Sequence, residues 1–337
     1  MIKKITVVLA LSAAAIAQAA PVTFNFVYQD AAGVGFNDAT LGAQRKAALV
    51  AAGETWGSLL NASYAGETIN ISVSFNSAST SISPLASTSA GNTVYANAAL
   101  GGQGVANRIY TAPLAEHLAG HNLNGSTVDF GLSFNPNVST YLGLDGSPGT
   151  GQYDFETYAL RGIGNALGFH SRIYRSATPA AEGAVKGGFY AYYDSASNSL
   201  VRLPGIYDSF LADGNGTSLL AMTDAQRFTA LTSGSLYWTG ANAVAANGGA
   251  YVRLNSMAPT ADGSITGNVA HYFDVSVDSL MSYPPVAGVS KTVDPIMLGV
   301  MKDIGWNVSA VPEPSTYAML FAGLAIIGST ARRRMRT

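Results

Sequence analysis

The chain has 337 residues, a length that suits one large domain or two modest ones. Hydrophobic residues make up 48% of it, enough for a sizeable core, whereas only 11% of residues are charged, which favours an exported protein over a cytosolic enzyme. The absence of cysteine excludes a disulfide framework, a thiolate metal site and a thiol nucleophile.

Residues 1–19 have the layout of a signal peptide. Lys3 and Lys4 form a basic end, residues 5–16 are apolar, and Ala17-Gln18-Ala19 is a small-x-small cleavage site for signal peptidase. The alternative is a buried N-terminal helix, which would explain neither the charged flank nor the cleavage site. We therefore expect export, with residues 1–19 removed.

The other end, residues 311–337, has three parts. Pro312-Glu313-Pro314 leads into an apolar run, and arginines close the chain. Counted from Thr316 to Ala331, the run just reaches the length of a membrane span, and the arginines would keep the end on the cytoplasmic side. This tail resembles the PEP-CTERM sorting signal. The resemblance implies an exosortase-type processing enzyme as partner, transient anchoring in the inner membrane, and release to the cell surface or beyond.

Charge is unevenly distributed between the body and the two ends. Residues 1–19 hold two of the 18 basic residues, and residues 311–337 hold four of them with one of the 20 acidic residues. The body therefore keeps 12 basic and 19 acidic residues, a net charge of about −7. Nucleic acids and anionic membranes need a basic surface, so neither is an expected partner.

Between the ends we expect one compact body, residues 20–310, with an upper half of about 20–170 and a lower half of about 171–310. Alternating residues predict strands and a helical repeat of apolar residues predicts helices, which gives an α+β order of strand, helix, two strands and helix. Looser structure follows, and a last helix ends the body. The expected strands are 23–28, 68–75, 127–134, 189–193, 236–240 and 250–254, and the expected helices are 38–60, 114–119, 154–168, 224–232 and 294–304. Residues 77–92 are Ser/Thr/Ala-rich and predicted to be a loop.

The stretch from Asp154 to Gly168 is the most informative part of the body. Its apolar residues fall on one face of a helix, and Arg161 and Asn165 lie four apart on another face. A simple interpretation is that these two side chains lie on an exposed helix face.

Several blocks together resemble bacterial secreted zincin metallopeptidases with a leishmanolysin-like pattern. They are 35–38, 141–146, 151–154, 166–169, 238–240, 242–249, 271–274 with 280–281, and 303–306. The resemblance covers the whole body and implies a zincin-like fold, a small mixed sheet with the site helix packed on it. In such enzymes two helix histidines bind zinc beside a general-base glutamate. A third histidine and a turn methionine complete the site.

By this resemblance His271 matches the third ligand and Met281 the turn methionine. The helix positions do not match, because Arg161 and Asn165 stand for the two histidines and Gly162 stands for the glutamate. Arginine offers only donors, glycine has no side chain, and an asparagine amide is a poor zinc ligand. No cofactor is therefore expected, although the family would carry zinc.

The other histidines have plainer interpretations. His117 and His121 are four apart, but Gly120 ends their helix, so we expect two surface histidines. His170 is one residue early for an elongated zincin motif and is interpreted as a loop histidine. Asp213 to Thr217 resembles a calcium loop without the later bidentate acid and is predicted to be a turn.

The sequence thus predicts an exported surface or matrix protein that is a catalytically inactive metallopeptidase homologue. The cleft that binds substrate in the resembling peptidases would here bind a peptide or matrix ligand, with Arg161 beside His271 holding a carboxylate. Two alternatives stay open. One is an active zinc endopeptidase with another ligand set, and the other is a purely structural matrix protein.

Overall fold

The computed structural model describes residues 20–79, 85–90, 94–125, 128–194, 199–265 and 269–309. The predicted signal peptide and the predicted sorting tail lie outside these residues.

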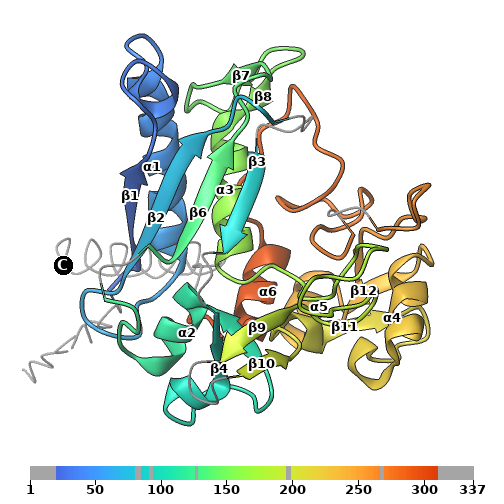
Figure 1. The fold of residues 1–337 in the computed structure, drawn as a ribbon. Helices are drawn as coiled ribbons and strands as arrows, with labels where there is room; N and C mark the ends of the chain where they lie inside the picture. The colour runs from blue at the N-terminus through green and yellow to red at the C-terminus, as the bar shows by residue number, and fades with distance from the viewer. Residues whose placement is uncertain are drawn as a thin grey trace, which may run out of the picture.

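A four-stranded mixed sheet organises the first half of the body, in the order β1-β2-β6-β3 (Figure 1). The first three strands are parallel, and the edge strand β3 runs antiparallel to β6. The bounds are β1 Thr23–Tyr28, β2 Thr68–Phe75, β3 Leu85–Ala90 and β6 Phe130–Phe134.

Strict alternation along β2 explains which face of the sheet is buried. Ile69, Ile71 and Val73 point into the core, as expected for a period of two. On the opposite face, the Asn70 side chain accepts a hydrogen bond from Asn25 of β1 at 2.9 Å in an exposed setting. The sheet therefore has one face that needs covering by helices.

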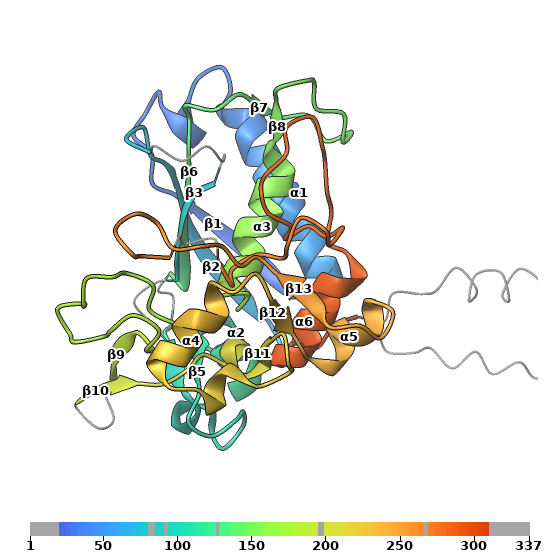
Figure 2. The ribbon, with the colours of Figure 1, turned by 90° about the vertical axis from the view of Figure 1, so that its right-hand side faces the viewer.

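Two helices, α1 (Gly42–Leu59) and α3 (Phe155–Ala166), cover that face, and the turned view shows both on one side of the sheet (Figure 2). A Cβ added at Gly53 of α1 would lie 2.9 Å from the Phe26 ring, so glycine permits this close approach. The Trp56 indole nitrogen donates a buried hydrogen bond to the Leu160 carbonyl at 2.9 Å. The α1–α3 pair is thus tied by packing and by a hydrogen bond.

The second half gathers beyond one end of the sheet (Figure 1). It contains an antiparallel three-stranded sheet, β11-β12-β13, and the helices α4, α5 and α6. Their bounds are β11 Leu211–Asp213, β12 Leu236–Trp238, β13 Val252–Leu254, α4 Asp224–Leu231, α5 Ala241–Ala246 and α6 Pro295–Ile304. Buried side chains of both halves form one continuous hydrophobic cluster.

Small elements connect these layers. They are β4 Val94–Ala96, β5 Ile109–Thr111, α2 Ala112–Ala119, β7 Thr140–Tyr141, β8 Tyr153–Asp154, β9 Ala191–Asp194 and β10 Ser199–Arg202, with 3-10 turns at Gly35–Asn37, Asn97–Leu100, Tyr207–Phe210 and Leu219–Ala221.

The structure differs from the sequence-based prediction at several segments. Residues 85–90, predicted to be loop, form β3, because their backbone pairs with β6 although their small polar side chains give no hydrophobic pattern. The strand predicted from residue 127 begins at Phe130. Helix α5 was not expected, and its short alanine-rich run is held by packing on α6.

Candidate functional site

Helix α3 begins where its sequence predicts. The carboxylate of the N-cap residue Asp154 accepts hydrogen bonds from the Thr157 backbone at 3.3 Å and the Thr157 hydroxyl at 2.6 Å. Along the helix Arg161 is only 5% exposed and Asn165 only 6% exposed. The interpretation that both lie on an exposed helix face is therefore wrong, because α3 is buried on every side.

The Arg161 guanidinium holds a distant turn of the chain. Its Nη1 donates hydrogen bonds to the carbonyls of Leu280 at 2.9 Å and Ser282 at 2.8 Å, on either side of Met281. The guanidinium carbon lies 4.7 Å from the centre of the Tyr272 ring, a cation–π distance. We call residues Ser279–Tyr283 the methionine turn, and Arg161 fastens it to α3.

Met281 itself lies beneath α3. A Cβ added at Gly164 would be 3.8 Å from the Met281 sulfur and 2.9 Å from the Met297 methyl group of α6. The Asp294 carboxylate accepts a hydrogen bond from the Leu280 backbone at 2.7 Å and also caps α6 through the Ile296 backbone at 3.0 Å. The methionine turn and α6 thus both reach Gly164 of α3.

His271 lies beside His170, with ring centres 4.2 Å apart. Its Nε2 donates to the Ser171 carbonyl at 3.1 Å. Burial, and then the charge of Arg175, lowers the pKa of His271 well below its ordinary value, and the same causes lower the pKa of His170 to about 3. Both imidazoles are therefore neutral at neutral pH, and His170 is one member of a ring pair.

Two arginines and an aspartate next to these rings were not singled out from the sequence. Asp208 accepts hydrogen bonds from the backbones of Arg172 at 3.0 Å and Gly205 at 2.9 Å. Arg175 is 6% exposed. The only sequence pattern that marks the two arginines is the Arg-x-x-Arg that follows His170-Ser171. The proximity of these arginines to His271 depends on the fold and cannot be seen in that pattern. We call His170, His271, Arg172 and Arg175 the His–Arg cluster.

His117 of α2 and His121, which follows the helix, have different surroundings. His117 is 2% exposed, and its Nδ1 lies 2.9 Å from a carboxylate oxygen of Glu67, whereas its Nε2 accepts a hydrogen bond from the Asn307 backbone at 3.2 Å. The prediction of a surface position is wrong for His117, because Glu67 and Asn307 bury it. It is correct for His121, which is exposed. Within the described ranges no three His, Asp or Glu side chains form a group suited to a metal ion.

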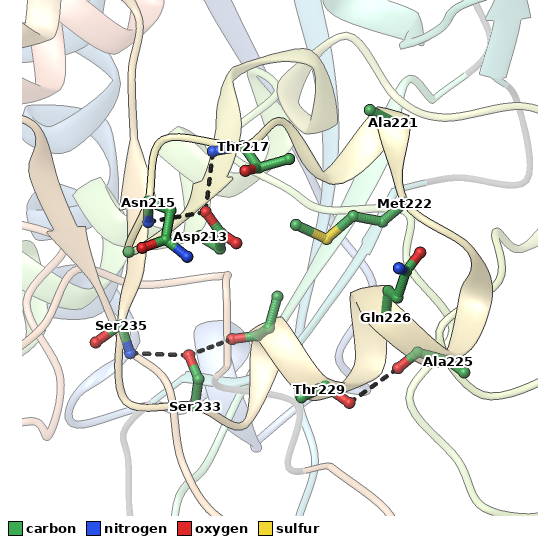
Figure 3. Close-up of a pocket in the computed structure, with 12 residues that line it drawn as sticks. Asp213, Asn215, Thr217, Ala221, Met222, Ala225, Gln226, Thr229, Ser233 and Ser235 are labelled. Carbon is green, nitrogen blue, oxygen red and sulfur yellow. Dashed lines mark hydrogen bonds between the residues drawn. The ribbon is translucent and has the colours of Figure 1, made fainter.

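An open groove of about 830 Å³ lies between α4 and the turn that follows β11 (Figure 3). Asp213 forms that turn as predicted, since its Oδ1 accepts from the backbones of Asn215 and Thr217 at 2.9 Å each. Apart from the Asp213 carboxylate the lining side chains are neutral, and Met222 and Gln226 stand on the α4 side. None of the five predicted site residues lines this groove.

Comparison with known proteins identifies one segment. Residues 310–334 match the PEP-CTERM protein-sorting motif, which confirms the sorting signal predicted at Pro312, Glu313 and Pro314. No curated protein matches the chain, and no solved structure matches it. The metallopeptidase resemblance of the body therefore stays a prediction, and the observed fold is described as mixed α/β with small sheets.

The motif marks the chain as an exported protein that exosortase sorts and that is transiently anchored in the membrane through its C-terminal segment. Among the helices that the structure describes, none has the length and apolar character to cross a membrane.

Proposed function

We propose that this chain is an exported surface or matrix protein whose body is a zincin-like scaffold without peptidase chemistry. The observation that carries the proposal is the contact between Arg161 and the methionine turn, 119 and 121 residues further along the chain. A metallopeptidase of the resembling family would place a ligand histidine at the Arg161 position and a methionine turn below it. The meeting of these two segments supports the resemblance.

The chemistry of these positions supports an inactive site. Arg161 carries a permanent positive charge, and its Nη1 is engaged by two carbonyls. Gly162 has no group that could activate water. His271 directs Nε2 to the Ser171 carbonyl rather than to a metal. We therefore infer that the body neither needs zinc nor hydrolyses peptides.

The same contact weakens one part of the sequence-based hypothesis. Arg161 was expected to hold a ligand carboxylate beside His271, but its buried guanidinium already fastens the methionine turn. A peptide or matrix ligand would have to bind without it. The groove between α4 and the β11 turn is an open surface for such a ligand, and its hydroxyl and amide side chains, together with the Asp213 carboxylate, suit a polar partner.

Restoring the missing ligands tests the zincin-like arrangement. The triple variant Arg161→His, Gly162→Glu, Asn165→His should bind about one zinc ion per chain, which plasma mass spectrometry of the dialysed protein measures. The matched control is Arg161→His with Gly162→Glu alone, which lacks one ligand and should bind far less. If the triple variant keeps the wild-type circular dichroism and binds no zinc, the zincin-like arrangement is contradicted. If it does not fold, the double variant Arg161→His, Asn165→His provides the same comparison without a buried glutamate.

A further inference from the structure

The His–Arg cluster carries more positive charge than its surroundings neutralise. Arg175 is more than nine-tenths buried, and its Nε and Nη2 have no hydrogen-bond partner among the described residues. The Nε of Arg172 is likewise buried and without a partner in the described part of the chain. A guanidinium cannot release its proton, so both charges persist.

Asp208 does not balance this charge. The charge of Asp208 acts on both arginines, yet among the described residues no ion pair joins its carboxylate to either guanidinium. Its oxygens accept backbone hydrogen bonds from Arg172 and Gly205 instead. Burial also raises the pKa of Asp208, which weakens it as a counter-charge. A buried cation without a partner destabilises a fold.

A small cavity lies against this cluster. Its volume is about 20 Å³, and His170, Arg172, Thr111 and residues 205–207 are among those that line it. The Thr111 hydroxyl is buried and has no hydrogen-bond partner in the described ranges. A cavity of this size holds one water-sized particle. Phosphate, sulfate and carboxylate groups have several heavy atoms each, whereas a chloride ion is a single atom that is only moderately larger than water.

We propose that the His–Arg cluster is a binding site for a small monovalent anion of halide size, with chloride as the ion to test. The Arg172 Nε and the Thr111 hydroxyl are the donors at the cavity, and Arg175 supplies the second positive charge. Burial and then the arginines hold the pKa of both imidazoles below its ordinary value, so the arginines alone supply the positive charge of the cluster. This inference is independent of the zincin-like proposal.

Chloride binding is measured directly by ³⁵Cl NMR of the full exported chain. The wild-type protein should broaden the chloride resonance, and bromide should reverse the broadening by competition. Arg172→Met and Arg175→Met should each abolish it, whereas Arg253→Met should not, because Arg253 lies on the surface with its side chain 46% exposed. Wild-type protein that is folded but leaves the resonance unchanged would overturn the proposal, as would equal broadening by the Arg172 and Arg175 variants.

Thermal stability gives a second measurement. Its comparison of two salts on the wild-type protein does not depend on any variant folding. At constant ionic strength the wild-type Tm should be about 3 °C or more higher in sodium chloride than in sodium gluconate, because an ion that binds only the folded state stabilises it. Arg175→Met should lose this difference and, in gluconate, should be at least as stable as the wild type. An equal rise of Tm in acetate or sulfate would show a general salt effect and contradict the proposed site.

Discussion

The contacts of Arg161 decide how the candidate site is interpreted. The positive charge of Arg161 would repel zinc only if the guanidinium lay where the metal would be. In the structure the guanidinium has another role. Its guanidinium satisfies two carbonyls of the methionine turn, one before and one after Met281. The position has therefore become part of the scaffold, which is why we treat it as structural rather than as a ligand-binding arginine.

Replacing Arg161 should destabilise the body. Arg161→Leu removes two charge-assisted hydrogen bonds and leaves buried carbonyls unpaired, so we expect the free energy of unfolding to fall by about 3 kcal/mol in urea titrations. Arg253→Leu is the matched control, and its exposed ion pair with Asp274 should contribute less than about 1 kcal/mol. Equal effects of the two substitutions would contradict a structural role for Arg161.

Glu116 gives stability a dependence on pH. This carboxyl is 2% exposed, and burial, then the charge of Asp129, raises its pKa to about 7 from an ordinary 4.5. Because the folded state holds the proton more tightly, the group favours folding fully below pH 4.5, and this contribution is lost as pH rises to about 7.

The substitution Glu116→Gln isolates that contribution, since it keeps the shape and removes the titration. The stability of the wild type relative to the variant should fall by about 3 kcal/mol as pH rises from 4.5 to above 7. His170 and His271 act in the opposite direction below pH 6.5, because the unfolded state then binds the proton more readily. They are present in both proteins and cancel in the comparison. A difference in unfolding free energy that does not change with pH would contradict the shift at Glu116.

At the scale of elements, the packing of α5 on α6 depends on one glycine. A Cβ added at Gly299 of α6 would lie 2.5 Å from the Ala243 Cα of α5, so the helices approach backbone to backbone. The Asp303 carboxylate, on the last turn of α6, accepts hydrogen bonds from the Asn242 and Ala243 backbones at 2.9 and 3.1 Å.

Gly299→Ala should therefore lower Tm although alanine is the better helix former. Helix propensity alone would raise stability by about 1 kcal/mol, whereas the clash with backbone atoms should cost about 1–3 kcal/mol more than that gain. Thermal unfolding followed by circular dichroism gives the sign. An unchanged or higher Tm would show that α5 and α6 are not in close contact.

Elements with strong local patterns were predictable from the sequence. Strands β1 and β2 have the predicted bounds because their side chains alternate strictly, and α3 and α6 begin one residue after the predicted starts at Asp154 and Asp294. Strand β3 and helix α5 were not predictable, because tertiary pairing holds them rather than their own composition. Sequence-based prediction therefore succeeded where local periodicity dominates.

The site was predictable in part. The blocks of the family resemblance placed Arg161 near Met281, and the structure brings the two segments together. The burial of His117 by Glu67 and the gathering of Arg172 and Arg175 around His271 were not foreseen. Such contacts join segments 50 residues or more apart, and no spacing rule along the chain reveals them.

At the scale of the whole molecule, the sorting motif determines where the body works. Replacing Pro312, Glu313 and Pro314 by alanine should leave the chain in the membrane fraction, because exosortase would no longer recognise the tail. Immunoblots of membrane and extracellular fractions measure this, with Ser309→Ala as a control just before the matched residues. Release of the alanine variant at the wild-type level would contradict sorting through this motif.

We propose that the body carries no zinc and performs no hydrolysis. The most direct test of this proposal is the metal content of the purified wild-type chain, measured together with casein cleavage in the presence and absence of a chelator. We predict far less than one zinc ion per chain and no chelator-sensitive cleavage. One zinc ion per chain, or casein cleavage that the chelator stops, would contradict the account and favour an active peptidase with another ligand set.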